Sequence, residues 1–139
     1  MKNNKKKANS KVGKKNKQNE QNEDRQNVLD LLDRGNEFGI SLIMITLGSK
    51  GVFYRRKGNV GEGDLHGIVP AEEVDVCDTN GAGDTFLGAV LAQIANNGSI
   101  PAERVQLEAM LTFANRAAAL TCSRPGAIPA MPTLAELGE

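Results

Sequence analysis

The sequence predicts an α/β fold with a mostly parallel sheet, and three observations lead to this class. Residues 40–47 form a nearly continuous apolar run rich in β-branched side chains, which is typical of a strand covered on both faces. Two later stretches, 86–97 and 101–120, carry apolar residues at helical spacing. Strands followed by helices in this way indicate helices packed on a mainly parallel sheet.

The chain of 139 residues opens with a polar leader at 1–27, in which Val12 is the one large apolar residue after Met1. Such a composition cannot bury enough apolar surface to offset the entropy of ordering. We therefore expect a disordered leader followed by one domain at 28–139. The formal net charge is zero, but lysines give the leader a positive charge that the rest of the chain balances.

A lysine-rich leader could bind nucleic acid, and an interaction protein acting through this leader is one alternative for the chain. No aromatic residue stands among the lysines to stack on bases, so we expect a solvated extension and no nucleic-acid partner. No apolar stretch of signal length follows the N-terminus, and 40–47 is too short to cross a bilayer. These features predict a cytoplasmic chain without a membrane partner.

The two cysteines, Cys77 and Cys122, fit no metal-binding spacing. Their number allows a disulfide, but buried free thiols suit a cytosolic protein better. The elements before residue 78 are expected in this order: a short helix at 28–32 that stops at Gly35, strands at 40–47 and 52–56 joined by a turn at 48–51, a polar loop from Lys57, and shorter strands at 66–71 and 73–77.

The helix that follows is the clearest element of the sequence. Phe86, Val90 and Ile94 repeat every four residues, and Asn97-Gly98 ends the pattern. A second helix is expected to start near Pro101, because proline suits a first turn, and to run to about Leu120.

A glycine-rich loop, Asp78-Thr79-Asn80-Gly81-Ala82-Gly83-Asp84, leads into the first of these helices. Small residues leave the backbone N–H groups unshielded where a helix begins, and the helix dipole makes that end partly positive. The loop is therefore a candidate anion site. Asp84 stands beside it as a candidate base, although it could be only a helix-start carboxylate, and Asp78 could only brace the turn.

Two better-known loop motifs do not fit these residues. A P-loop needs a lysine after its last glycine, but Asp84 follows Gly83. A calcium-binding EF-hand loop needs an oxygen ligand at its fifth position and a glutamate at its twelfth, and alanines, Ala82 and Ala89, stand there.

Residues 78–86 resemble the signature Asp-Thr-x-Gly-Ala-Gly-Asp-x-Phe of the ribokinase-like (pfkB) carbohydrate kinases. The segments 46–52, 113–120 and 126–133 also resemble that family, and Gly-Ala-Ile-Pro-Ala-x-Pro in the last is most like fructokinases. The resemblance covers about 28–139. It implies the C-terminal part of a three-layer α/β/α fold, without the sugar-binding N-terminal half of a full member.

The resemblance implies ATP-dependent phosphorylation of a sugar hydroxyl, with Mg²⁺ and also K⁺ as cations. By the resemblance, Asp84 would be the base that takes the proton of the sugar hydroxyl. The backbone N–H groups of Gly81, Ala82 and Gly83 would hold the developing negative charge. The nucleotide would be bound by Thr46, Gly48, Ser49, Gly51 and Asn115. A monovalent cation would be held by Asp78, Asn80, Thr121, Arg124 and Gly126.

Each of these residues also has a purely structural interpretation: the glycines of 48–51 suit a tight turn, and Asn115 could be a buried amide with its hydrogen bonds satisfied. Expected partners are ATP and a small sugar, together with a second copy of the chain or a complementing N-terminal half. The alternative within the same family is a truncated, inactive remnant that at most binds nucleotide.

Overall fold

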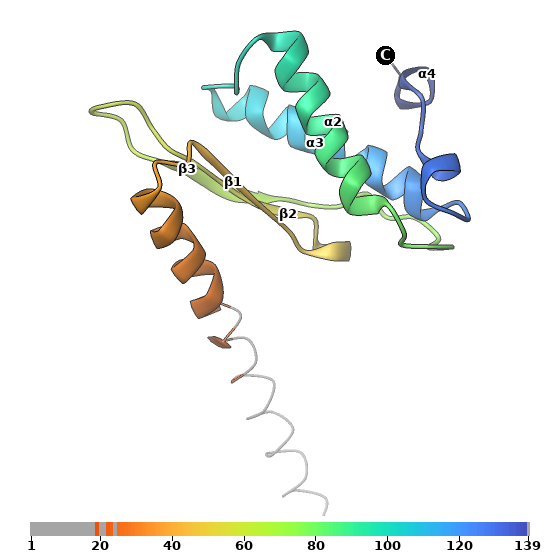
Figure 1. Cartoon of the computed structure of the whole chain (residues 1–139), viewed down its shortest axis with the longest axis horizontal. Coiled ribbons are helices and arrows are strands. Elements are labelled where there is room, and N and C mark those ends of the chain that lie inside the picture. The colour runs from red at the N-terminus through yellow and green to blue at the C-terminus, as the bar shows by residue number, and fades with distance from the viewer. Residues whose placement is uncertain (1–18, 20–21, 24, 139) are drawn as a thin grey trace, which may run out of the picture. The chain divides into compact units, whose positions relative to one another are not determined.

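The computed structural model describes residue 19, residues 22–23 and residues 25–138 (Figure 1). The chain divides into two compact units, Met1–Ile40 and Ser41–Glu139. The predicted disordered leader at 1–27 lies for the most part outside the described residues, so its boundary at residue 28 stays a prediction.

The described part of the first unit is helical, and its helix runs through residues 25–37. It includes residues before the expected start at 28, and within it the Gln26 side chain donates to the Asp30 carboxylate one turn later at 2.9 Å. The predicted stop at Gly35 is wrong. The helix ends at residue 37. Gly39 follows it with a φ of 68°, and the Ile40 N–H donates back to the Gly35 carbonyl at 2.9 Å.

The second unit contains a three-stranded sheet in the order β1 (Leu42–Thr46), β2 (Val52–Arg56), β3 (Leu65–Val69). A short 3₁₀ turn, η1 (Gly48–Lys50), joins the first two strands. Both strand pairs are antiparallel, with Thr46 opposite Val52 and Val52 opposite Val69.

The expected mostly parallel sheet is therefore not found among the described strands. The physical reason is the length of the connections: parallel neighbours need a crossover of a dozen or more residues, and both links here are shorter. The strand expected at 66–71 is present as β3, but residues 73–77 contain no strand. Pro70 has no N–H to continue the ladder beyond β3, and two glutamates follow at positions 72 and 73.

Two helices, α2 (Ala82–Asn97) and α3 (Arg104–Cys122), lie side by side over one face of the sheet (Figure 1). The end of α2 at Gly98, which has a φ of 75°, confirms the predicted stop. The helix α3 begins later than Pro101. The core between helices and sheet consists of Val52, Tyr54, Val69, Phe86, Val90, Leu107, Met110, Leu111 and Ala114.

Tyr54 anchors α3 to the central strand. It is fully buried, its hydroxyl donates to the Glu108 carboxylate, and Arg104 donates to the same hydroxyl at 2.7 Å. Burial, followed by the hydrogen bond to Glu108, raises the pKa of Tyr54 to about 12. The phenol therefore stays neutral, and the polar contacts fix the position of α3 over β2.

No helix in the described part of the chain has both the length and the apolar character needed to cross a bilayer. Both cysteines are free thiols, but the prediction that they are buried is wrong: Cys77 is exposed and Cys122 is half-buried. Cys77 lies in the segment after Pro70 that joins no strand, and it is not part of the core.

Candidate functional site

A cavity of about 650 Å³ lies within the second unit, where the β1–β2 connection, the signature loop and α3 meet. Its lining residues are Thr46, Gly48, Ser49, Gly51, Ala71, Glu72, Glu73, Val74, Val76, Thr79, Ala82, Gly83, Phe86, Asn115, Ala118, Ala119 and Cys122. Segments that are far apart in the sequence therefore share one surface.

All five predicted nucleotide-binding residues are in this lining, together with Ala82 and Gly83 of the signature loop. The fold thus brings the two predicted halves of the site together. The lining also includes Glu72, Glu73, Val74 and Val76, which the sequence interpretation missed. That segment carries no sequence motif. Only its tertiary contact with α3 shows that it forms part of the cavity wall.

Asn115 makes that contact. Its side-chain amide, on α3, donates to the carbonyls of Val69 at 3.1 Å and Pro70 at 2.9 Å. This buried residue therefore has the structural role that the sequence left open, and it also lines the cavity. By holding the chain at Pro70, Asn115 sets where the following segment enters the cavity wall.

Gly81 begins α2 in a left-handed conformation, with a φ of 79°. A Cβ atom built at this position would lie 3.0 Å from the Ala127 Cβ, so both the backbone and the available space favour glycine. The first internal bond of α2 runs from the Thr85 N–H to the Gly81 carbonyl at 2.9 Å. The N–H groups of Gly83 and Asp84 come before this bond and have no acceptor one turn earlier within the helix.

Asp84 lies in the first turn of α2 and is exposed. It follows Gly83 directly, but it is not among the residues that line the cavity. Asp84 is therefore next in sequence to a cavity residue, at the partly positive end of a 16-residue helix.

Asp78 joins the signature loop to the loop after α3. One of its carboxylate oxygens accepts the Asn80 N–H at 3.0 Å, and the other accepts the Gly126 N–H at 3.1 Å. The hydrogen bond from Asn80, then that from Gly126, lowers the pKa of Asp78. Of the predicted cation residues, Asp78, Asn80 and Gly126 are thus in direct contact.

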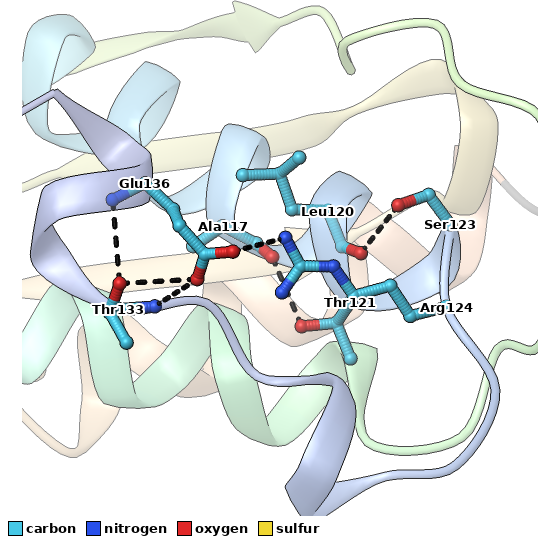
Figure 2. Close-up of polar contacts among 7 residues, drawn as sticks. All are labelled: Ala117, Leu120, Thr121, Ser123, Arg124, Thr133 and Glu136. Carbon is cyan, nitrogen blue, oxygen red and sulfur yellow. Dashed lines mark hydrogen bonds and ion pairs between the residues drawn. The ribbon is translucent and has the colours of Figure 1, made fainter.

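Of the remaining two predicted cation residues, Thr121 lies in the last turn of α3 and Arg124 lies just after the helix (Figure 2). Thr121 is fully buried, and its hydroxyl donates to the Ala117 carbonyl at 3.1 Å. The Thr121 carbonyl accepts the Arg124 N–H at 3.3 Å. The Arg124 guanidinium points away from this bond to the Glu136 carboxylate, at 2.6 Å (Figure 2).

Glu136 forms an ion pair with Arg124 and so links the C-terminal segment to the residues that follow α3. It belongs to the short helix α4 (Leu134–Leu137), where it accepts the Thr133 N–H at 2.8 Å in a capping box. The hydrogen bond from Arg124, then that from the Thr133 backbone, lowers the pKa of Glu136 from its ordinary 4.5 to about 2 (Figure 2). The charged form is therefore the one that the fold stabilises.

We expect Glu136→Gln to destabilise the chain modestly at pH 7, because the side chain is partly exposed and solvent screens the pair. A depressed pKa in the folded state gives stability that is present above the ordinary pKa and is lost as pH falls. The difference in Tm between wild type and variant should thus narrow from about pH 4.5 to about pH 2.

Thermal unfolding followed by circular dichroism across this pH range measures that difference. Glu103→Gln is the control, because the Glu103 side chain makes no capping hydrogen bond to α3. A wild-type advantage over Glu136→Gln that stays constant down to about pH 2 would contradict the assignment.

Comparison with known proteins matches residues 1–134 to the pfkB family carbohydrate kinases. The chain is 44% identical over 94 residues to probable fructokinase-2 of Arabidopsis thaliana, and this match covers 68% of the chain and 27% of that relative. The chain thus spans about a quarter of the relative's length.

Solved structures agree with the sequence match. Fructokinase from Vibrio cholerae O395, in its fructose-, ADP- and calcium-bound form, superposes with a TM-score of 0.65 at 29% identity, over 77% of this chain and 32% of that one. A double mutant of the same enzyme, bound to fructose, ADP and potassium, superposes with a TM-score of 0.65 at 28% identity, with the same coverage.

The α/β unit, the glycine-rich start of α2 and these matches define a class, the ribokinase-like carbohydrate kinases. The chain belongs to the pfkB family of carbohydrate kinases. Its relatives of known sequence and structure include fructokinases.

Proposed function

We propose that this chain is the nucleotide-binding and catalytic part of a fructokinase-like enzyme that transfers a phosphoryl group from ATP to a sugar hydroxyl. One observation supports this proposal above the others. The cavity is lined both by the five candidate nucleotide residues and by Ala82 and Gly83 at the start of α2. A γ-phosphate at that helix start would meet the N–H groups of Gly83 and Asp84, which precede the first bond of the helix, and the positive end of the dipole.

In this proposal Asp84 takes the proton of the attacking hydroxyl. Its position in the first turn of α2, immediately after the cavity residue Gly83, supports this role. The N–H groups of Gly81 and Gly83 hold the charge that develops on the phosphoryl oxygens, and Ala82 joins them only if its N–H leaves the Thr79 carbonyl, to which it donates at 3.4 Å. Asp78 and the loop containing Gly126 form the side of the site proposed to hold potassium. A relative whose structure contains potassium supports a potassium ion in such an enzyme.

Magnesium fits this site as a companion of the nucleotide. The described residues contain no group of three or more His, Cys, Asp or Glu side chains arranged to hold a metal ion. Magnesium at kinase sites is usually held by the substrate phosphates, waters and one or two carboxylates. The acidic residues among the cavity lining are Glu72 and Glu73. When bound, the ion would neutralise phosphate charge, and the chain's own residues would orient the phosphates.

Gly83→Ala should separate structural from functional roles at the helix start. Gly83 lies in the first turn of α2, and a Cβ atom there meets nothing within 4 Å, so alanine should stabilise the helix by up to about 1 kcal/mol, the value for a helix interior. The added methyl group would nevertheless narrow the cavity at the proposed phosphate position. We therefore expect higher stability together with nucleotide affinity that is at least about tenfold weaker, a loss of roughly 1.4 kcal/mol.

Gly88→Ala is the matched control. Gly88 also lies in α2 with open space around its Cβ position, but it does not line the cavity. It should gain stability and keep its affinity. Titration of a fluorescent ATP analogue and urea unfolding measure the two quantities. If Gly83→Ala binds the analogue as well as Gly88→Ala does, the proposed phosphate position is wrong.

The isolated chain should be a poor catalyst. Holding a sugar in line with the γ-phosphate can account for several powers of ten in rate. We propose that the sugar contacts come from the remaining length of the kinase, because the chain spans only 27% of its Arabidopsis relative. ATP-dependent phosphorylation of fructose by the purified chain should stay close to background and rise when a complementing N-terminal part is supplied.

This assay also tests the alternatives. An inactive remnant would show no turnover even with the complementing part. Robust turnover by the chain alone would show that no complementing N-terminal part is needed. Binding of nucleic acid that is lost on removal of residues 1–25 would instead favour an interaction protein acting through its leader. We further propose a cytoplasmic location, in keeping with free thiols and a soluble sugar substrate.

A further inference from the structure

Two thiols that are far apart in the sequence lie close together in the fold. The Cys77 N–H donates to the Cys122 carbonyl oxygen at 2.8 Å, and the Asp78 N–H donates to the same oxygen at 3.1 Å. Because covalent geometry fixes the other distances within each residue, the first bond keeps the Cα atoms of the two cysteines within about 7 Å of each other. This is the range that a disulfide can bridge.

The surroundings of the two thiols allow the bridge to form. Both are free, Cys77 is exposed, and Cys122 is half-buried at the end of α3, where it lines the cavity. Cys77 lies at a bend in a segment without helix or strand. The thiol of Cys77 can therefore turn toward Cys122 without breaking a ladder of strand hydrogen bonds.

We propose that Cys77 and Cys122 form a redox modification site, which a low-molecular-weight disulfide such as oxidised glutathione converts to an intramolecular disulfide. The exposed Cys77 thiolate attacks one sulfur of oxidised glutathione, whose S–S bond breaks and releases one glutathione thiolate. The Cys122 thiolate then attacks the Cys77 sulfur of the mixed disulfide and releases the second. Two protein thiols are oxidised, one glutathione disulfide is reduced, and the two thiol protons pass to the released thiolates.

The bridge would act on the signature loop through its first residue. Asp78 follows Cys77, and its carboxylate accepts the N–H groups of Asn80 and Gly126. A covalent link from Cys77 to the end of α3 would hold this residue, and therefore the entry into α2, in the position described above. The inference rests on the two thiols and does not depend on the proposed kinase function.

The test exposes the reduced full-length chain to oxidised glutathione, quenches the reaction with a maleimide under denaturing conditions and measures the intact mass. We expect a monomer lighter by two hydrogens, with neither maleimide nor glutathione attached, and full return of both thiols after dithiothreitol. Both thiols remaining free, a lasting glutathione adduct, or bonds between chains as the main product would each overturn the proposal.

Two controls show that the fold is responsible. Cys77→Ser and Cys122→Ser should each keep a glutathione adduct on the remaining cysteine, because no second thiol is present to displace it. The oxidation equilibrium should favour the intramolecular bond at least about tenfold more in buffer than in 6 M urea, because only the folded chain brings the two Cα atoms together. An equal equilibrium in the two solvents would mean that chance encounter in a flexible chain is sufficient, and would overturn the site.

Discussion

Asp84→Asn should abolish sugar phosphorylation while leaving ATP affinity nearly unchanged. The substitution keeps the size of the side chain at the first turn of α2 but removes the proton acceptor. General-base catalysis typically contributes about 10²–10⁴-fold to a rate, so we expect a loss of that order. The loss should appear in kcat, because the proton is transferred only in the chemical step.

The measurement needs a competent enzyme, for example a chimera in which this chain replaces the matching part of the Arabidopsis fructokinase. Steady-state kinetics with fructose and titration of an ATP analogue give the rate and the affinity. Asp75→Asn, an exposed carboxylate outside the cavity lining, is the control and should behave as wild type. A variant that retains more than about a tenth of the rate would show that Asp84 is not the base.

Gly51→Ala should unfold the second unit or come close to doing so. Gly51 follows η1 with a φ of 97°, and a Cβ atom there would lie 2.0 Å from the Val69 carbonyl oxygen and 2.7 Å from the Ala71 nitrogen. These are backbone atoms at the end of β3 and cannot turn aside as a flexible side chain could. Backbone strain and overpacking together should cost about 3 kcal/mol or more.

Gly61→Ala separates the two causes of that loss. Gly61 has a similar φ of 90°, but its Cβ position meets nothing within 4 Å, so only the backbone strain of about 1 kcal/mol applies. Urea unfolding of the two variants and the wild type gives the comparison. Equal destabilisation by the two substitutions would mean that contact with β3 contributes nothing.

Much of the site could be predicted because its signals are local. Gly81 to Asp84, followed by apolar residues at helical spacing, indicates an anion-binding helix start, and α2 begins at Ala82. Glycine at position 98 indicates where that helix ends, because its left-handed conformation is rare for other residues. The β-rich run that contains β1 was likewise evident from its composition.

Other predictions were wrong because the interactions that decide them involve residues beyond the short sequence pattern on which each prediction was based. A glycine pattern suggested that the first helix stops at Gly35, but the helix continues to residue 37, and the hydrogen bond from Ile40 back to the Gly35 carbonyl closes it through a left-handed Gly39. An apolar strand does not reveal whether its neighbours run parallel or antiparallel. That direction follows from short connections and from the register that pairs Val52 with both Thr46 and Val69.

The sequence by itself determined the family, the helix start with its candidate base, and the two groups of residues proposed to meet ATP and a cation. Only the tertiary structure decided that those groups share one cavity, that Asn115 holds the chain at Pro70, and that Cys77 meets Cys122. The physical reason is the distance along the sequence over which the deciding interactions act. Helix caps and turns depend on backbone conformation within a few residues, whereas a cavity wall depends on contacts between segments that only the packing of α3 against the sheet brings together.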